Sequence, residues 1–117
     1  MREVKVGSHL IIDYYFCDKA AVNDINIIKS IIRGIAAGIE VVILKESYQE
    51  FAPVGITGIA IVSESHISVH TWPEYDYMGI DIFSCREINQ DVVLGILKSY
   101  LRSDSYNCRY IDRYSVV

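Results

Sequence analysis

The feature that most constrains the fold of this chain is a pair of apolar stretches on either side of a short polar break at residues 63–66. Before the break, residues 56–62 are apolar on both faces, which is typical of a strand inside a sheet. After the break, Ile67 and Val69 alternate with polar residues, as in a strand with one buried face. The pattern predicts two neighbouring strands, with the polar residues at the point where they meet.

The rest of the chain shows the same two kinds of periodicity. Strands are expected at residues 7–16, 41–44 with an irregular continuation to 51, 67–71, 77–85 and 106–112, and helices at 23–39 and from 89 or 91 to 101. Asn23 or Asp24 is the expected N-cap of the first helix and Gly38 its end. This order predicts an α+β fold, a two-layer sandwich of a mainly antiparallel sheet with two helices on one face. The other sheet face is left for function or for a partner.

Length and charge limit what such a chain can do. At 117 residues and 51% hydrophobic content, we expect residues 1–117 to form a single domain. A domain of this size has little room for an enclosed ligand pocket, so a pocket at an interface is plausible. The net charge of -4 and the lack of a basic run argue against nucleic-acid binding and favour a cationic ligand.

Neither a membrane span nor a cysteine framework is predicted. There is no apolar stretch of 18 residues and no signal-peptide pattern, so we expect a cytoplasmic protein without a membrane partner. The three cysteines, Cys17, Cys85 and Cys108, have no C-x-x-C spacing, which favours neither disulfides nor a zinc site. His66 and His70 are four residues apart on a predicted strand without a third ligand, so no metal is expected.

Taken singly, the candidate catalytic residues can each be explained by an ordinary structural role. A lone Ser65 could be a turn residue, and it lacks the Gly-x-Ser-x-Gly pattern of a hydrolase nucleophile. A lone His70 is more often a core or surface residue than a catalyst. A lone Cys85 is most often a small buried apolar residue.

Together these residues match a longer motif. Residues 64–75 read ESHISVHTWPEY, preceded by GITG at 55–58 and followed by DIFSC at 81–85. This motif resembles the short prokaryotic S-adenosylmethionine decarboxylase family. The resemblance extends from Gly7 and His9 to the last predicted strand, so that it covers nearly the whole chain.

The resemblance implies a self-processing enzyme. The chain would be cut between Glu64 and Ser65 into a β chain of residues 1–64 and an α chain of residues 65–117. The Ser65 hydroxyl would attack the Glu64 carbonyl to give an ester, whose elimination and hydrolysis leave a pyruvoyl cofactor. His70 would act in the elimination, and Thr57 would supply the hydroxyl that assists processing.

The resemblance also implies the reaction and the substrate site. Decarboxylation of an amino acid needs a carbonyl that forms a Schiff base and accepts electrons, and Cys85 would then return a proton. Phe51 would stack on adenine, Trp72 would line the pocket and Glu74 would bind the ribose of S-adenosylmethionine. The alternative for Phe51 and Trp72 is ordinary packing in the core, and the alternative for Glu74 is a solvated carboxylate in a turn. A homodimer and a role in spermidine biosynthesis are implied as well.

Strand geometry adds one expectation of its own. Five residues of straight strand would separate Ser65 from His70 by about 16 Å, too far for a hydrogen bond. We therefore expect the chain to bend at residues 64–67, which would also expose the scissile peptide in a strained turn.

Several positions depart from the family pattern and leave the substrate open. Residues 49–51 are Gln-Glu-Phe in place of a His-basic-Phe segment, and Asp76 and Arg86 each replace a common glycine. Glu50 and Asp76 could favour a second cationic end, so an arginine or ornithine decarboxylase of the same family is the alternative. A non-processing regulatory subunit is less favoured, because Ser65, His70 and Cys85 are all retained.

Overall fold

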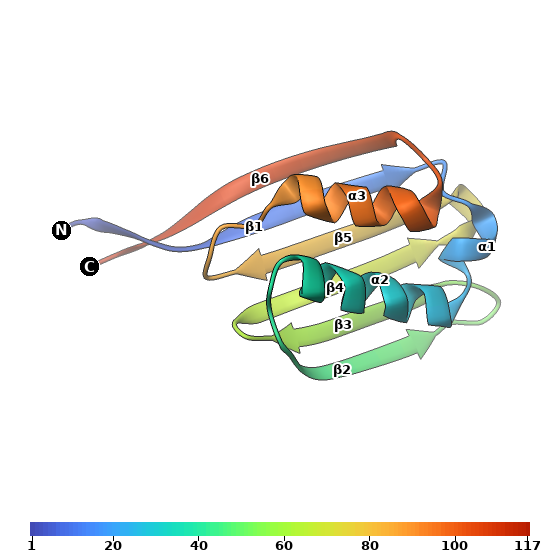
Figure 1. Cartoon of the computed structure of the whole chain (residues 1–117), viewed down its shortest axis with the longest axis horizontal. Helices are drawn as coiled ribbons and strands as arrows, with labels where there is room; N and C mark the ends of the chain where they lie inside the picture. The colour runs from blue at the N-terminus through green and yellow to red at the C-terminus, as the bar shows by residue number, and fades with distance from the viewer.

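The computed structural model describes residues 1–117 and contains one six-stranded antiparallel sheet with helices packed on one side of it (Figure 1). The strands are β1 (Glu3–Tyr15), β2 (Ile43–Glu50), β3 (Ile56–Val62), β4 (Ser65–Trp72), β5 (Tyr77–Ser84) and β6 (Ser105–Val116). The helices are α1 (Lys19–Val22), α2 (Ile25–Gly38) and α3 (Gln90–Leu101), and a short 3₁₀ turn, η1, spans Pro73–Tyr75. None of the helices is long and apolar enough to cross a membrane.

The strands lie in the order β2-β3-β4-β5-β1-β6. Strands β2 to β5 follow one another as neighbours, whereas β1 is inserted between β5 and β6 and pairs antiparallel with both. The β3–β4 turn and the end of β5 therefore lie at one end of the sheet, and the β2–β3 loop and α1 lie at the other (Figure 1).

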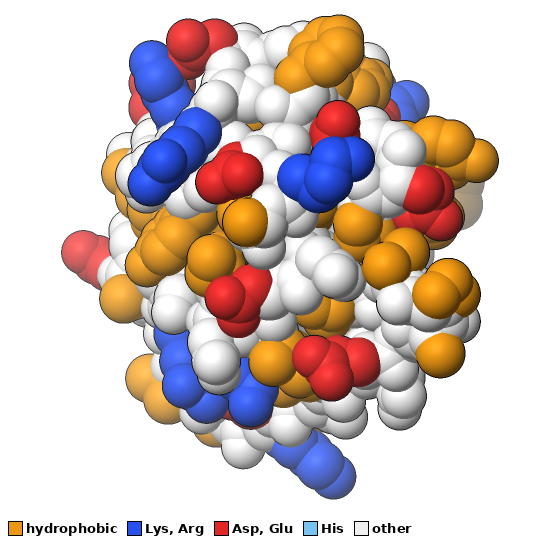
Figure 2. All heavy atoms as spheres, turned by 90° about the vertical axis from the view of Figure 1, so that its right-hand side faces the viewer, with side chains coloured by type: hydrophobic (Ala, Val, Ile, Leu, Met, Phe, Trp, Pro, Cys, Tyr) orange, Lys and Arg blue, Asp and Glu red, His pale blue; other side chains and the backbone are white.

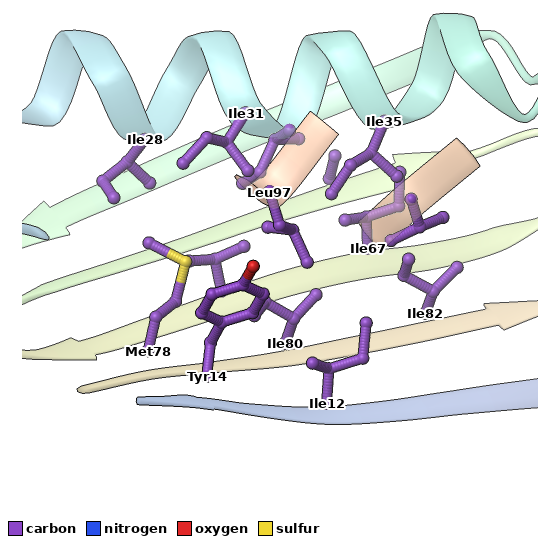
Figure 3. Close-up of a cluster of buried hydrophobic side chains, with 14 of the residues drawn as sticks. Ile12, Tyr14, Ile28, Ile31, Ile35, Ile67, Met78, Ile80, Ile82 and Leu97 are labelled. Carbon is purple, nitrogen blue, oxygen red and sulfur yellow. The ribbon is translucent and has the colours of Figure 1, made fainter. Parts of the chain in front are cut away.

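The core fills the space between the sheet and the helices. Figure 3 shows Ile28, Ile31 and Ile35 of α2 pointing toward Ile67 of β4 and Ile82 of β5, and all five are fully buried. Their spacing along α2 gives one apolar stripe, which is the pattern of a helix that covers a sheet. Burying such side chains contributes about 1.5–3 kcal/mol each.

The opposite face of the sheet carries no helix. Along β3 the buried residues alternate with more exposed ones, and Ile59 and Ile61 are 44% and 50% exposed. The residues of β5 alternate in the same way between buried and half-buried. We call this uncovered surface the open face. Two isoleucines of one strand, exposed side by side on the same face, make it a candidate contact surface.

The predicted α+β fold and the helices on one face are confirmed, and the differences are local. The helix predicted from residue 23 is α2, and α1 is an additional short helix before it that was not predicted. Asp18 caps α1, and Asp24 caps α2 with its side chain accepting the Asn26 amide at 2.9 Å. The first and last strands are longer than expected, since β1 and β6 pair along almost their full length. Asn89 is the N-cap of α3, and it is one of the two residues near which this helix was predicted to begin.

Candidate active site

Ser65 lies at the tight turn between β3 and β4. Residues 63 and 64 form the turn, Glu64 is exposed, and Ser65 is the first residue of β4. Its φ is 122°, a value that side chains other than glycine rarely adopt. Strained backbone of this kind costs about 1–3 kcal/mol and is concentrated at functional sites. The expectation of a strained turn with an accessible Glu64–Ser65 peptide agrees with this geometry.

Cys85 lies next to this turn. Ser65 pairs in register with Ser84 of β5, and Cys85 is the residue that follows. The alternation along β5 buries Ser84 against the helices and leaves Cys85 exposed. The strand pairing therefore brings the predicted cleavage site and the predicted proton donor to the same end of the sheet.

Thr57 and His70 form a second cluster on the open face. They pair in register across β3 and β4, and Thr57 Oγ1 lies 3.1 Å from His70 Nδ1. This hydrogen bond orients the imidazole ring and leaves its Nε2 free for other contacts. The Thr71 hydroxyl, on the buried side of the strand, accepts the Ile56 amide at 2.9 Å and so holds the two strands together here.

The predicted bend between Ser65 and His70 is wrong. Both residues belong to β4, which pairs continuously with β3 and β5 from Ser65 to His70. Hydrogen bonding on both edges leaves no room for a bend, because bending would break one of the two ladders. Within one copy of the chain, the Ser65–Cys85 cluster and the Thr57–His70 cluster are therefore separated by about 16 Å.

The residues predicted to bind substrate surround His70. Phe51, Trp72 and Glu74 line a pocket of about 200 Å³ together with Thr57 and His70. Phe51 is 52% exposed and Trp72 44% exposed, so neither is an ordinary core residue. The Trp72 ring packs against Tyr77, with ring centroids 5.5 Å apart. Aromatic faces open to solvent beside a carboxylate suit a cationic or heteroaromatic ligand.

A larger groove of about 810 Å³ adjoins this pocket and shares Val54 and Glu74 with it. Figure 2 views this end of the molecule, where acidic side chains lie among exposed hydrophobic ones. Glu50 lines the groove. Asp76, the other acidic substitution, is paired with Lys19 at 3.1 Å. Its φ of 51° is one that aspartate tolerates better than most residues, which explains how it can replace a glycine.

The structure also brings together on the open face polar residues for which no role was predicted from the sequence. His9 Nε2 lies 3.3 Å from Asp81 Oδ1, and the His9 and His66 rings are in edge contact at 6.5 Å. Burial lowers the pKa of His66, and the nearby His9 adds to this effect. Tyr77 donates a hydrogen bond of 2.5 Å to Asp13, and burial raises its pKa. Strand register brings these residues together, and no local sequence pattern shows that they are neighbours.

The residues at the turn fit the group that the resemblance implies. A pyruvoyl group is formed from a serine, and Ser65 follows an exposed turn residue with its backbone in a strained conformation. At the start of a separate chain it would stay beside Ser84 and Cys85, because β4 remains paired with β5. The neighbouring thiol is an acid–base group of the kind that such chemistry needs.

Comparisons with known proteins agree with this architecture. The crystal structure of the adenosylmethionine decarboxylase from Aquifex aeolicus superposes with a TM-score of 0.85 at 24% identity, covering 97% of this chain and 94% of that one. That likeness defines the fold as the one seen in adenosylmethionine decarboxylase. A family model described as S-adenosylmethionine decarboxylase matches residues 8–114. The chain belongs to the S-adenosylmethionine decarboxylase family.

Similar curated proteins are S-adenosylmethionine decarboxylase proenzymes of bacteria. The one from Thermotoga petrophila is 37% identical over 82 residues, which is 70% of this chain and 63% of that protein. The one from Acidithiobacillus ferrooxidans is 34% identical over 85 residues, which is 73% of this chain and 64% of that protein. The one from Thermosipho melanesiensis is 31% identical over 99 residues, covering 84% and 76%. The match to the first two spans less than two thirds of their length.

Proposed function

We propose that this chain is a proenzyme that cuts itself between Glu64 and Ser65 and then decarboxylates S-adenosylmethionine. The observation that carries the proposal is the position of Ser65, which follows an exposed glutamate in a tight turn with a φ of 122° and pairs in register beside Cys85. The family membership and the names of the bacterial relatives support the same reaction.

Processing requires an activated hydroxyl and a base. The Ser65 hydroxyl attacks the Glu64 carbonyl, and relief of the strained φ favours the attack. The subsequent elimination requires removal of the Ser65 α-proton, for which His70 is the candidate base. Thr57 keeps the His70 ring in one orientation through the 3.1 Å hydrogen bond.

These roles require two copies of the chain, because Ser65 and His70 are about 16 Å apart on a straight strand. If two open faces pack together about a two-fold axis that runs across the strands, the Ser65–Cys85 end of one copy meets the Thr57–His70 end of the other. Each dimer then contains two equivalent sites. Burial of Ile59 and Ile61, both exposed in the single chain, would stabilise this contact.

The chain's own residues would share the work of the decarboxylation. When formed, the pyruvoyl group supplies a ketone that binds the substrate amine and accepts the electron pair left by carbon dioxide. Cys85 then donates a proton to the substrate carbon. Phe51 and Trp72 provide aromatic faces for the adenine ring and the sulfonium, and Glu74 provides oxygens for the ribose hydroxyls.

Intact-mass measurement tests the processing step. The purified chain should give two fragments, residues 1–64 and residues 65–117, and the second should begin with a group that borohydride reduces. A Ser65→Ala chain should stay whole. The substrate is tested by the release of labelled carbon dioxide from S-adenosylmethionine, arginine and ornithine. Release from S-adenosylmethionine alone supports the proposal, whereas release from arginine or ornithine alone would assign a different substrate.

A further inference from the structure

The segment of residues 40–42, which follows α2, is hydrogen-bonded to the turn of residues 63 and 64, where the proposed cleavage occurs. The Ser63 amide donates to the Val42 carbonyl at 2.9 Å, and the Val42 amide donates to Ser63 Oγ at 3.1 Å. Ser63 is thus held from both its backbone and its side chain, two residues before Ser65. Rotation of the turn relative to this segment would break both bonds.

The same segment is bonded to the loop that carries the thiol. Arg86 follows Cys85, and its Nη2 donates to the Glu40 carbonyl at 2.9 Å. The Arg86 amide donates to Ser84 Oγ at 3.1 Å, so that hydrogen bonds hold the backbone on both sides of Cys85. The family resemblance places a glycine at position 86, which has no side chain to make the contact with Glu40.

Residues 40–42 are themselves fixed to the body of the protein. The Glu40 and Val41 amides donate to the carbonyls of Ala37 and Ala36 at 3.2 and 2.9 Å, which joins the segment to the end of α2. Val41 is only 8% exposed and belongs to the hydrophobic core. The segment can therefore act as a rigid support for what is bonded to it.

We infer that residues 40–42 are a shared anchor that sets the position of the scissile peptide relative to Cys85, and that Ser63 and Arg86 are positioning residues that act through it. This inference rests on the proposed function. It differs from the assignment of catalytic residues, because neither Ser63 nor Arg86 needs to touch the substrate.

Positioning of the thiol decides the product. Cys85 has to protonate the substrate carbon that lost carbon dioxide, and not the carbon contributed by Ser65. If the carbon contributed by Ser65 is protonated instead, hydrolysis leaves the substrate nitrogen on the protein. The substrate then departs as an aldehyde, whose oxygen comes from water, and the ketone carbon is reduced as the substrate carbon is oxidised. The α chain would begin with alanine, about 1 Da heavier than its pyruvoyl form, and would be inactive.

Two substitutions in the full chain test the anchor through two readouts that do not depend on activity alone. Ser63→Ala removes the acceptor for the Val42 amide, and Arg86→Ala removes the bond to Glu40. Each is expected to slow self-cleavage by about fivefold and to raise the yield of alanine-terminated α chain per turnover by about fivefold, the effect of one lost hydrogen bond. The first is followed by the conversion of whole chain to fragments, and the second by the mass of the α chain.

Matched controls separate the anchor from general loss of structure. Ser99→Ala removes a serine that donates to the Ile96 carbonyl on α3, and Arg33→Ala removes an arginine bonded to Glu46. Neither lies in the anchor, so both are expected to behave like the original chain. Ser63→Thr and Arg86→Lys keep a bonding group and should recover much of the lost effect. Because Arg86 is exposed, its variants keep the test valid if Ser63→Ala does not fold.

If Ser63 and Arg86 act through one shared anchor, each substitution should affect both steps. If each residue acted only on its own surroundings, each substitution would affect one step. Ser63→Ala has to raise the alanine-terminated fraction, and Arg86→Ala has to slow cleavage. If each variant changes only the step nearest to it, or neither changes either step, the shared anchor is wrong. A chain with no substitution that stays whole overturns the proposed function and the anchor with it, whereas normal cleavage beside unaffected variants overturns the anchor alone.

Discussion

Thr57 Oγ1 and His70 Nδ1 lie 3.1 Å apart on neighbouring strands of the open face, at the opposite end from Ser65. The contact fixes one ring nitrogen and leaves the other available, and in the proposed dimer that nitrogen would act on a group of the partner copy. This contact and the distance between the two clusters lead to the first two predictions.

Loss of the Thr57 hydroxyl should slow self-cleavage. Thr57→Val keeps the shape of the side chain but removes the hydrogen bond to His70, and we expect cleavage to slow by about 10- to 100-fold through loss of ring orientation. Thr57→Ser keeps the hydroxyl and should remain within severalfold of the original chain. Gel electrophoresis over time measures the change, and equal rates for the two variants would contradict the role.

Two inactive chains should complement each other if the site is composite. A His70→Ala chain and a Ser65→Ala chain are each expected to stay whole when made alone. When the two are made together, the His70→Ala chain should be cut, because it meets an intact His70 on its partner. Chains with different affinity tags show which one is cleaved. Cleavage of the Ser65→Ala chain, or of neither chain, would contradict the two-fold arrangement.

The cysteines should differ sharply in reactivity. Burial raises the pKa of Cys17 to about 12, so its thiol keeps its proton well above neutral pH, while Cys85 is exposed. Because the thiolate is the nucleophile, iodoacetamide at about pH 8.5 should modify Cys85 and leave Cys17 untouched in the folded protein. Peptide mass mapping measures both sites. In denaturant the two should react alike, which serves as the control.

The core between α2 and the sheet should dominate stability. Ile67→Ala removes a fully buried side chain and is expected to lower the free energy of unfolding by about 2–5 kcal/mol. Leu44→Ala, at a residue that is 66% exposed, should change it by about 0.5 kcal/mol or less. Urea unfolding in a Ser65→Ala background keeps the chain in one piece for the comparison. Similar effects at the two positions would contradict the assignment of the core.

The sequence predicted the parts of the structure that local patterns determine. The alternation at Ile67 and Val69 predicts the buried face of β4, and Asp24 is one of the two N-caps predicted for α2. The same patterns could not show that β4 is straight, because that depends on pairing along both of its edges. The expected bend was inferred on the assumption that Ser65 and His70 meet within one chain, and strand geometry excludes it.

Contacts between residues that are far apart in the sequence could not be predicted from local patterns either. Motif matching pointed to Ser65, His70 and Cys85, which lie in or near one continuous stretch of chain. The bond from Arg86 to the Glu40 carbonyl joins residues 46 positions apart, and it depends on where α2 ends relative to β5. Arg86, which replaces a common glycine of the family, therefore adds a contact that glycine could not make.

The strand order gives the cut molecule an unusual construction. A break after Glu64 would assign β1, β2 and β3 to one piece and β4, β5 and β6 to the other, yet β1 lies between β5 and β6. The strands of the two pieces are therefore interleaved in one sheet. Separating the pieces would break the pairing of β1 with both of its neighbours and the pairing of β3 with β4. A nicked molecule would hold together without any covalent link, and once separated its halves would have to find each other again in solution to refold.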